Sequence, residues 1–170
     1  MPTGLKQTSS TVAIGFSALE TAPNTFTQSS TDLNLSPLDR EVFVVTAINL
    51  DPIAPDFLAG LNTQVNCALT STSTTAVANL SSSNCMATAT LDIRAAGFVD
   101  GGVSFTRNGM ETPPATLDYI GIIATSDFFC SIKGVGNVGP KFVSGKLYGY
   151  RATANADIFA ALVQSEVLSA

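Results

Sequence analysis

Hydrophobic and polar residues alternate along most of the chain with the period of two that is typical of β-strands. In residues 10–18, Val12, Ile14 and Phe16 fall on one face, and a weaker alternation follows in residues 25–35. Residues 41–50, EVFVVTAINL, form the most apolar early segment. They are expected to be a central strand.

More strands are expected farther along the chain. The Thr-, Ser-, Ala- and Asn-rich stretch 62–91 fits two strands separated by NLSSSN. Pro52 and Pro55 exclude a ladder strand from residues 51–60, so a loop is expected there. The remaining candidate strands are residues 103–107, 117–125, 128–134 and 141–153. About eight strands separated by turns predict an all-β sandwich or barrel.

The last residues, 156–170, break this pattern. Their sequence ADIFAALVQSEVLSA has apolar residues at helical spacing, and Asn155 stands where a helix cap is expected. The apolar positions cover about half of the circumference of such a helix, with Glu166 intruding; they are Ile158, Phe159, Leu162, Val163 and Val167. Two alternatives follow: the helix folds back over an open end of its own domain, or it docks on a neighbouring subunit.

The length and composition favour one domain with an unusual surface. The 170 residues are expected to form a single β-sandwich over residues 1–170, with a flexible N-terminal arm at 1–9 and a C-terminal helix or arm at 155–170. Charged residues make up only 12% of the chain, about half of the usual fraction of about 25%. The hydroxyl side chains of 20 Thr and 17 Ser take their place, which favours strands and turns over exposed helices.

The charge distribution argues against direct binding of nucleic acid. The net charge is −5, and the eight basic residues are scattered along the sequence, whereas binding to a phosphate backbone needs several cations on one surface.

No apolar run approaches the roughly 20 residues that span a bilayer, and the first residues do not resemble a signal peptide. We therefore expect no membrane span and synthesis in the cytoplasm.

The sequence also lacks a catalytic motif. The chain has no histidine, which excludes Ser-His-Asp and Cys-His nucleophilic sites. No catalytic residue, cofactor or metal site is therefore expected, and the protein is expected not to be an enzyme. Three buried free thiols are favoured for Cys67, Cys85 and Cys130 over the alternative of a Cys67–Cys85 disulfide.

Two further motifs have simple structural interpretations. The segment GVGNVG, residues 134–139, resembles a phosphate-binding loop, but Pro140 and a strand follow it instead of a helix. A β-hairpin loop is expected there. Among the aromatic residues near the C-terminus, Tyr148 and Tyr150 are the pair free to reach a rim of the domain. They join the five apolar helix residues as candidate subunit-interface residues.

As a pattern, the whole chain resembles small capsid and capsid-decorating proteins of bacterial and archaeal viruses, including bacteriophages. The resemblance rests on the order of about eight strands, the Ser/Thr/Ala/Gly/Asn-rich segments and the size, and on no specific motif. It implies a single jelly-roll and a virion structural protein that self-assembles into, or decorates, an icosahedral shell. The partners would be copies of itself, in pentamers, hexamers or trimers, and other virion proteins.

The N-terminal sequence departs from capsid proteins that contact a genome through a basic arm, because MPTGLKQTSS contains only Lys6. A capsid protein of this kind would lie over an internal membrane or another protein layer, or outside the shell. The alternative is a non-catalytic β-sandwich binding module on a fibre or cell surface. It would recognise a carbohydrate or a receptor through loops 51–60 and 108–116.

Overall fold

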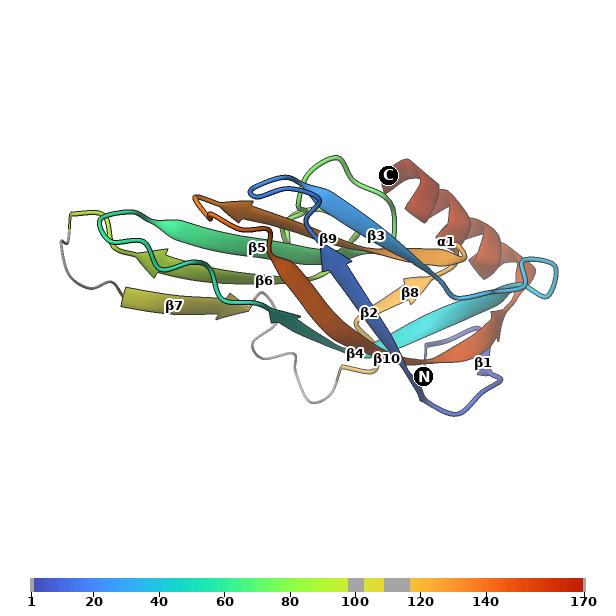
Figure 1. Ribbon diagram of the computed structural model, residues 1–170. Helices are drawn as coiled ribbons and strands as arrows, with labels where there is room; N and C mark the ends of the chain where they lie inside the picture. The colour runs from blue at the N-terminus through green and yellow to red at the C-terminus, as the bar shows by residue number, and fades with distance from the viewer. Residues whose placement is uncertain (1, 98–102, 109–116, 170) are drawn as a thin grey trace.

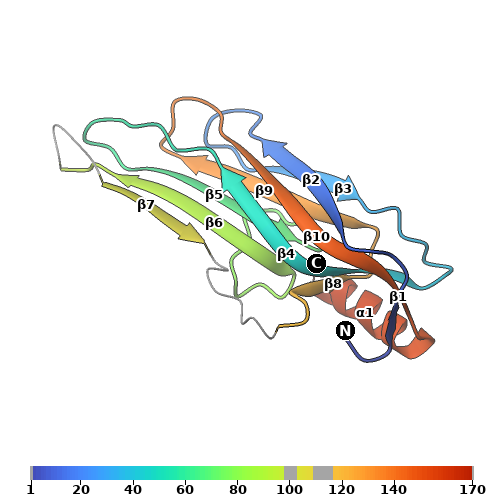
Figure 2. The ribbon, with the colours of Figure 1, turned by 90° about the horizontal axis from the view of Figure 1, so that it is seen from below.

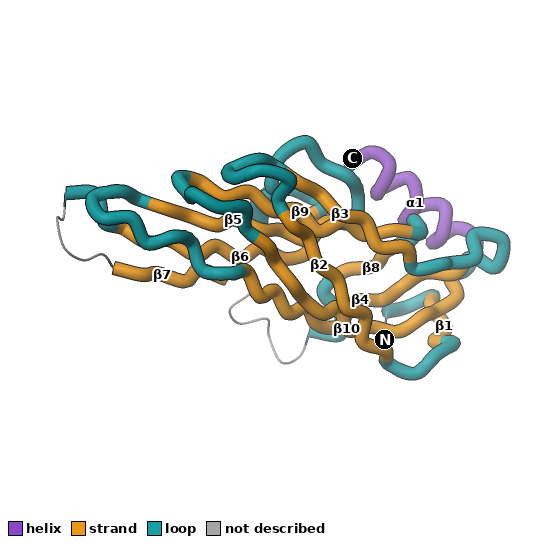
Figure 3. Tube along the Cα trace, in the orientation of Figure 1, coloured by secondary structure: helices purple, strands orange, loops and turns teal. Residues whose placement is uncertain are grey.

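The structure is a computed structural model, and it describes residues 2–97, 103–108 and 117–169. These residues form ten strands and one helix (Figures 1 and 3). The strands make two antiparallel sheets of five, which we call sheet A and sheet B.

Sheet A has the strand order β1–β10–β4–β8, and β2 pairs with β10 on the same side as β1. Its strands are β1 (Leu5–Gln7), β2 (Val12–Leu19), β4 (Glu41–Pro52), β8 (Gly121–Ile123) and β10 (Phe142–Ala154). Sheet B has the order β3–β9–β5–β6–β7. Its strands are β3 (Thr27–Asp32), β5 (Thr63–Thr70), β6 (Cys85–Arg94), β7 (Val103–Asn108) and β9 (Asp127–Val135).

The strand order is that of a jelly roll, with β2–β10–β4–β8 in one sheet and β3–β9–β5–β6 in the other. The chain changes sheets at each step from β2 to β5 and again from β8 to β10, as a pair of interleaved Greek keys requires. The expected all-β jelly-roll sandwich with a C-terminal helix is confirmed. Strands β1 and β7 extend the eight-stranded arrangement at its borders.

The core between the sheets depends on a β-bulge in β4. Phe43 and Val45 point into the core, and strict alternation would next send Ala47 and Asn49 inward. The pairing with β10 shifts register at Tyr148/Gly149, which leaves Thr46 as the extra residue. As a result Ile48 and Leu50 pack against the core instead. The bulge explains why EVFVVTAINL does not alternate along its whole length.

The other face of β4 is buried at its first residues, because helix α1 (Ala156–Ser169) covers Val42 and Val44. Val42 and Val44 point away from Phe43 and Val45, and they join a second apolar cluster with Tyr150 of β10. The helix supplies its partly buried residues Ile158, Phe159, Leu162 and Val163 to this cluster. Figures 1 and 2 both show α1 beside β8, at the end of the sandwich where β1 also lies.

Three sequence expectations need correction or refinement. The GVGNVG segment is not a hairpin loop, because β9 and β10 belong to different sheets and the segment crosses from one to the other. Strand β4 continues to Pro52, which has no N–H to donate but lies opposite Val143. Part of the predicted flexible arm at residues 1–9 forms β1, where Leu5 is buried and paired with Ala154.

Gly145 in β10 leaves room for an aromatic ring. It pairs with Phe16 of β2, and a Cβ atom at Gly145 would lie 2.4 Å from the Phe16 ring and 2.4 Å from the Asn49 carbonyl oxygen. Real Cβ atoms do not approach other atoms so closely. The absence of a side chain at this position therefore allows the core to close around Phe16.

We expect Gly145→Ala to lower the free energy of unfolding by about 1–3 kcal/mol, the usual cost of overpacking a core. Gly15→Ala is the matched control, since a Cβ atom at Gly15 in β2 would meet nothing within 4 Å. The control should change stability by less than about 1 kcal/mol. Urea unfolding of the two variants and the wild type measures the difference, and equal stabilities would contradict this account of Gly145.

Candidate assembly surfaces

The C-terminal helix is capped at its start and anchored to its own domain near its end. Asn155 caps it as expected, since the Asn155 Oδ1 accepts a hydrogen bond of 2.8 Å from the backbone N–H of Ile158. Near the other end, the carboxylate of Glu166 is buried and accepts hydrogen bonds from the backbone N–H groups of Ala124 (3.0 Å) and Thr125 (2.7 Å). These donors follow β8, so Glu166 ties α1 to the edge of sheet A.

The environment of Glu166 is unusual for a carboxylate. Burial raises the pKa of the Glu166 carboxyl above its usual value, while the hydrogen bonds from Ala124 and Thr125 limit that rise. The polar residue that interrupts the apolar stripe in the sequence is thus the hydrogen-bonded anchor of the helix. The sequence alone gives no sign of this role, because the donors lie about forty residues away.

The predicted interface residues fall into two groups. Tyr150 is buried under the helix, Tyr148 is half-buried, and Ile158, Phe159, Leu162 and Val163 pack on the domain itself. Val167 is 62% exposed, and its neighbour Leu168, which the sequence reasoning did not single out, is 76% exposed. The contact of this helix with a neighbouring subunit stays a prediction. Val167 and Leu168 are the large apolar side chains of the helix that are exposed enough to make one.

A small apolar cavity lies between the helix and the loops beside it. Its volume is about 280 Å³, and its walls are Leu35, Pro37, Ala124, Thr125, Ser126, Phe159 and Val163. Leu38, at the tip of the neighbouring turn, is 93% exposed. Exposed apolar groups therefore lie close to the helical end of the sandwich.

A second apolar surface, which we call the loop end, lies where β2–β3, β4–β5 and β9–β10 connect. The exposed apolar residues of these connections and of the adjoining strand ends are Leu19, Ile53, Phe57, Leu61, Val135, Val138 and Phe142. Leu19 and Phe142 are directly opposite each other on β2 and β10, and the Ile53 N–H donates to the Phe142 carbonyl. Val138 is 70% exposed in the middle of the GVGNVG segment.

The loop end is held rigidly by a buried polar side chain, Asn137. Its Nδ2 donates to the Gln64 carbonyl (2.9 Å), and its Oδ1 accepts from the Asp56 N–H (2.9 Å). Its backbone N–H and carbonyl both bond to the side chain of Asn24, at 2.8 Å each. One asparagine therefore joins three connections that are far apart in the sequence.

Two carboxylates complete this network. Buried Glu20 accepts hydrogen bonds from the Gly134 N–H (2.6 Å) and the Lys141 N–H (2.8 Å). Asp56 accepts from the Val138 N–H (2.9 Å) and pairs with the ammonium of buried Lys141. The hydrogen bond from Lys141 is the main cause that holds the pKa of Asp56 below its usual value. The apolar side chains of the loop end thus stand on a fixed, internally hydrogen-bonded base.

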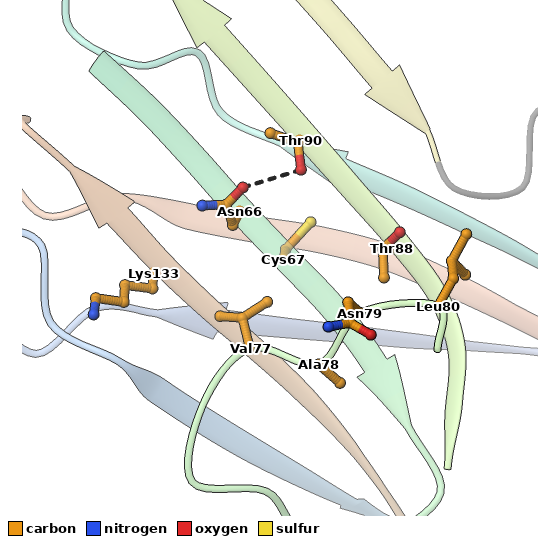
Figure 4. Close-up of a pocket in the computed structure, with 9 residues that line it drawn as sticks. All are labelled: Asn66, Cys67, Val77, Ala78, Asn79, Leu80, Thr88, Thr90 and Lys133. Atoms are coloured by element: carbon orange, nitrogen blue, oxygen red, sulfur yellow. Dashed lines mark hydrogen bonds between the residues drawn. The ribbon is translucent and has the colours of Figure 1, made fainter. Parts of the chain in front are cut away.

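A pocket on the outer face of sheet B has a volume of about 380 Å³ (Figure 4). Polar groups come from Asn66, Thr88, Thr90 and Lys133 on neighbouring strands, and the loop residues Val77 to Leu80 form the opposite wall. The Thr90 hydroxyl donates to Asn66 Oδ1 at 3.0 Å. No aromatic side chain lines this pocket, so it lacks a stacking surface for a sugar ring.

The three cysteines are free thiols, as the sequence predicts. Cys67 and Cys130 are buried and Cys85 is half-buried; all three are free, and burial raises the pKa of Cys67 and of Cys130 to about 12. Among the described residues, no group of His, Cys, Asp or Glu side chains could hold a metal ion, and no helix is long and apolar enough to cross a membrane. Of the loops suggested for a binding module, residues 51–60 belong to the loop end, and residues 109–116 lie outside the described residues.

The raised pKa of Glu166 predicts a pH dependence for the anchoring of α1. Because the folded protein favours the protonated carboxyl, its contribution to stability is complete below the ordinary Glu pKa of about 4.3 and is lost as the pH rises through the raised folded value. Wild type should therefore lose stability relative to Glu166→Gln between about pH 4 and pH 7. Urea unfolding of both proteins across this range measures the difference, and an increase with pH would contradict the raised pKa.

Asn137→Ala should lower the free energy of unfolding by about 1–3 kcal/mol, because the Gln64 carbonyl and the Asp56 N–H would lose their partner in a buried place. Asn49→Ala is the matched control, since Asn49 is exposed on the outer face of β4. Chemical unfolding compares the two. Equal effects of the two substitutions would mean that the Asn137 network does not support the loop end.

Comparison with known proteins identifies no family for this chain. No family model matches the sequence. No curated protein matches it either. Among solved structures, it is similar to part of the tailspike protein gp49 of Acinetobacter baumannii bacteriophage Fri1, a capsular polysaccharide depolymerase, at 11% identity and a TM-score of 0.17. The match covers 76% of this chain but only 20% of the tailspike, and a likeness at this level supports no inference about fold or function.

Proposed function

We propose that this protein is a non-enzymatic structural component of a virion, which self-assembles into, or decorates, an icosahedral capsid shell of a bacterial or archaeal virus. Its partners are copies of itself and other virion proteins, in pentamers, hexamers or trimers. It is made in the cytoplasm of the host and ends in the virion. The jelly-roll strand order supports this proposal, since viral capsid domains use it. Lectins and cupins use the same fold, so the fold alone does not decide between functions.

The observation that carries the proposal is the loop end. Side chains such as Phe57, Leu61 and Val138 are more than half exposed, on a base that the Asn137 network holds in place. Exposed apolar clusters on a fixed frame are typical of surfaces that bind another protein, because binding then orders few side chains. Few charges need to be desolvated at such contacts, since charged residues make up only 12% of the chain.

The second candidate function is a non-catalytic binding module that recognises a carbohydrate or a receptor on a fibre or cell surface. The pocket of about 380 Å³ on sheet B favours it, because the polar residues Asn66, Thr88, Thr90 and Lys133 contribute to its lining. A module of this kind stays small in solution and binds through one site. The two candidates therefore differ in their state of association.

Size-exclusion chromatography with light scattering and negative-stain microscopy of the purified protein test the proposal. We expect regular closed oligomers or larger particles at micromolar concentration. Phe57→Glu with Val138→Glu should weaken association at least tenfold, since the variant places charge in an apolar contact. Ser73→Glu with Thr75→Glu, at exposed positions of the loop over sheet B, adds the same two charges and should leave association unchanged.

A monomer at all concentrations would overturn the self-assembly proposal. Glycan-array binding by that monomer, lost in Asn66→Ala, would favour the binding module instead. Association that Phe57→Glu with Val138→Glu leaves unchanged would show that the loop end is not the contact.

A further inference from the structure

Strand β2 forms a border of sheet A. It pairs with β10 along its whole length, from Leu19 opposite Phe142 to Val12 opposite Gly149, without a shift of register. No strand pairs with its other side in the part of the chain that the structure describes. Figure 2 shows β2 at the edge of the sheet, with β10 and β4 on one side of it.

The backbone groups that point away from the sheet can be assigned. The Glu20 N–H donates to the Lys141 carbonyl at 2.9 Å, so this residue directs its backbone groups toward β10. Antiparallel strands use alternate residues for each neighbour. The even residues of β2 therefore face β10, and Ala13, Gly15, Ser17 and Leu19 direct their N–H and C=O groups outward. The Phe142 carbonyl, opposite Leu19, accordingly accepts from Ile53 on the far side of β10.

Strand β2 lacks the features that normally protect such an edge. Its sequence VAIGFSAL contains no charged residue and no proline, and the strand has no bulge. The other borders carry such features: β1 and β8 have three residues each, the sequence of β3 contains Asp32, and that of β7 contains Arg107. Beyond the residues that pair with β8, strand β4 has its bulge at Thr46 and ends in Asp51 and Pro52. A long, neutral and regular edge is one that another strand can join.

The side chains on the outer face of β2 leave room for that strand. Ala13, Gly15 and Ser17 are small and exposed, and a Cβ atom at Gly15 would meet nothing within 4 Å. At the end of the strand, Leu19 and its neighbour Phe142 are exposed at 61% and 43%. These two side chains add apolar surface beside the edge.

We propose that β2 pairs antiparallel with β2 of a second copy of this chain, about a two-fold axis near Gly15, so that two copies of sheet A become one continuous sheet. The inference rests on the self-assembly proposed above and names its contact. An antiparallel two-fold pair centred on Gly15 places Ala13 opposite Ser17 and Ile14 opposite Phe16. Odd residues then meet odd residues, so the outward N–H and C=O groups form the ladder while the small side chains stay on one face.

The charge pattern favours a second copy as the partner. A two-fold contact places the same surface on both sides, so any charge on the strand would oppose a like or nearby charge of the other copy. VAIGFSAL has none. A partner of different sequence would commonly be selected by complementary charge, which this edge does not offer. The neutral strand therefore matches itself.

Two substitutions at Ser17 test the edge. Ser17→Lys adds a charge on the outer face, and Ser17→Pro removes an N–H that β10 does not use. Each should lower the association constant at least tenfold, while Ala47→Lys, an equal charge change at an exposed site on the same face of β4, should associate as wild type does. Circular dichroism and urea unfolding check that each variant is folded.

Cross-linking gives a test that does not depend on weakened association. In a Cys85→Ala background, Gly15→Cys should be joined to its copy by a short bis-maleimide linker, because the two residues face each other across the axis. Ala47→Cys in the same background should not be joined. The expected product is a covalent dimer on a denaturing gel.

The outcomes separate this inference from the proposed function. If the wild type assembles, both Ser17 variants assemble equally well and Gly15→Cys is not cross-linked, the β2 contact is wrong while self-assembly stands. If the wild type remains a monomer, self-assembly and the β2 contact both fail. Loss of assembly in both Ser17 variants, with a Gly15→Cys dimer, supports the contact.

Discussion

The pairing of β10 with β4 is the interaction on which the rest of this structure depends. The two strands lie at the centre of sheet A, and each other strand of that sheet pairs with one of them. Phe43 and Val45 of β4 face the core between the sheets, while Val42 and Val44 face the helix. The bulge at Thr46 lets Phe43 and Val45 face the core before it and Ile48 and Leu50 face the core after it.

Buried carboxylates perform the same task at both ends of the sandwich. Glu20 joins the β2–β3 connection to Gly134 and Lys141, and Glu166 joins α1 to the residues after β8. Each accepts hydrogen bonds from two backbone N–H groups, which satisfies donors that would be costly to bury without a partner. Although the chain has few charged residues, two of its acidic side chains are thus buried as hydrogen-bond acceptors between elements. Its apolar and hydroxyl side chains remain to form the outer surface.

The sequence predicted the features that local pattern determines. Alternation located β2, the apolar run located β4, and Asn155 with the helical spacing located α1 and its cap. The sheet to which a strand belongs is not local, which is why GVGNVG was interpreted as a hairpin loop although β9 and β10 lie in different sheets. The partners of Asn137 and Glu166 are also distant in sequence, so no periodicity could indicate that these polar residues are buried. The exposure of Val167 and Leu168 and the partial burial of Phe159 on the same helix also depend on long-range packing.

The position of β10 also has a consequence for how the protein is made. Strands β1, β2 and β4 emerge from the ribosome long before residues 142–154, yet β10 is the strand that separates them in the finished sheet. During translation these early strands have no permanent neighbour, and the uncharged β2 edge is then open on both sides. Completion of sheet A is therefore a late event of synthesis. Two nascent chains on one messenger RNA would come into contact while sheet A still lacks its central strand.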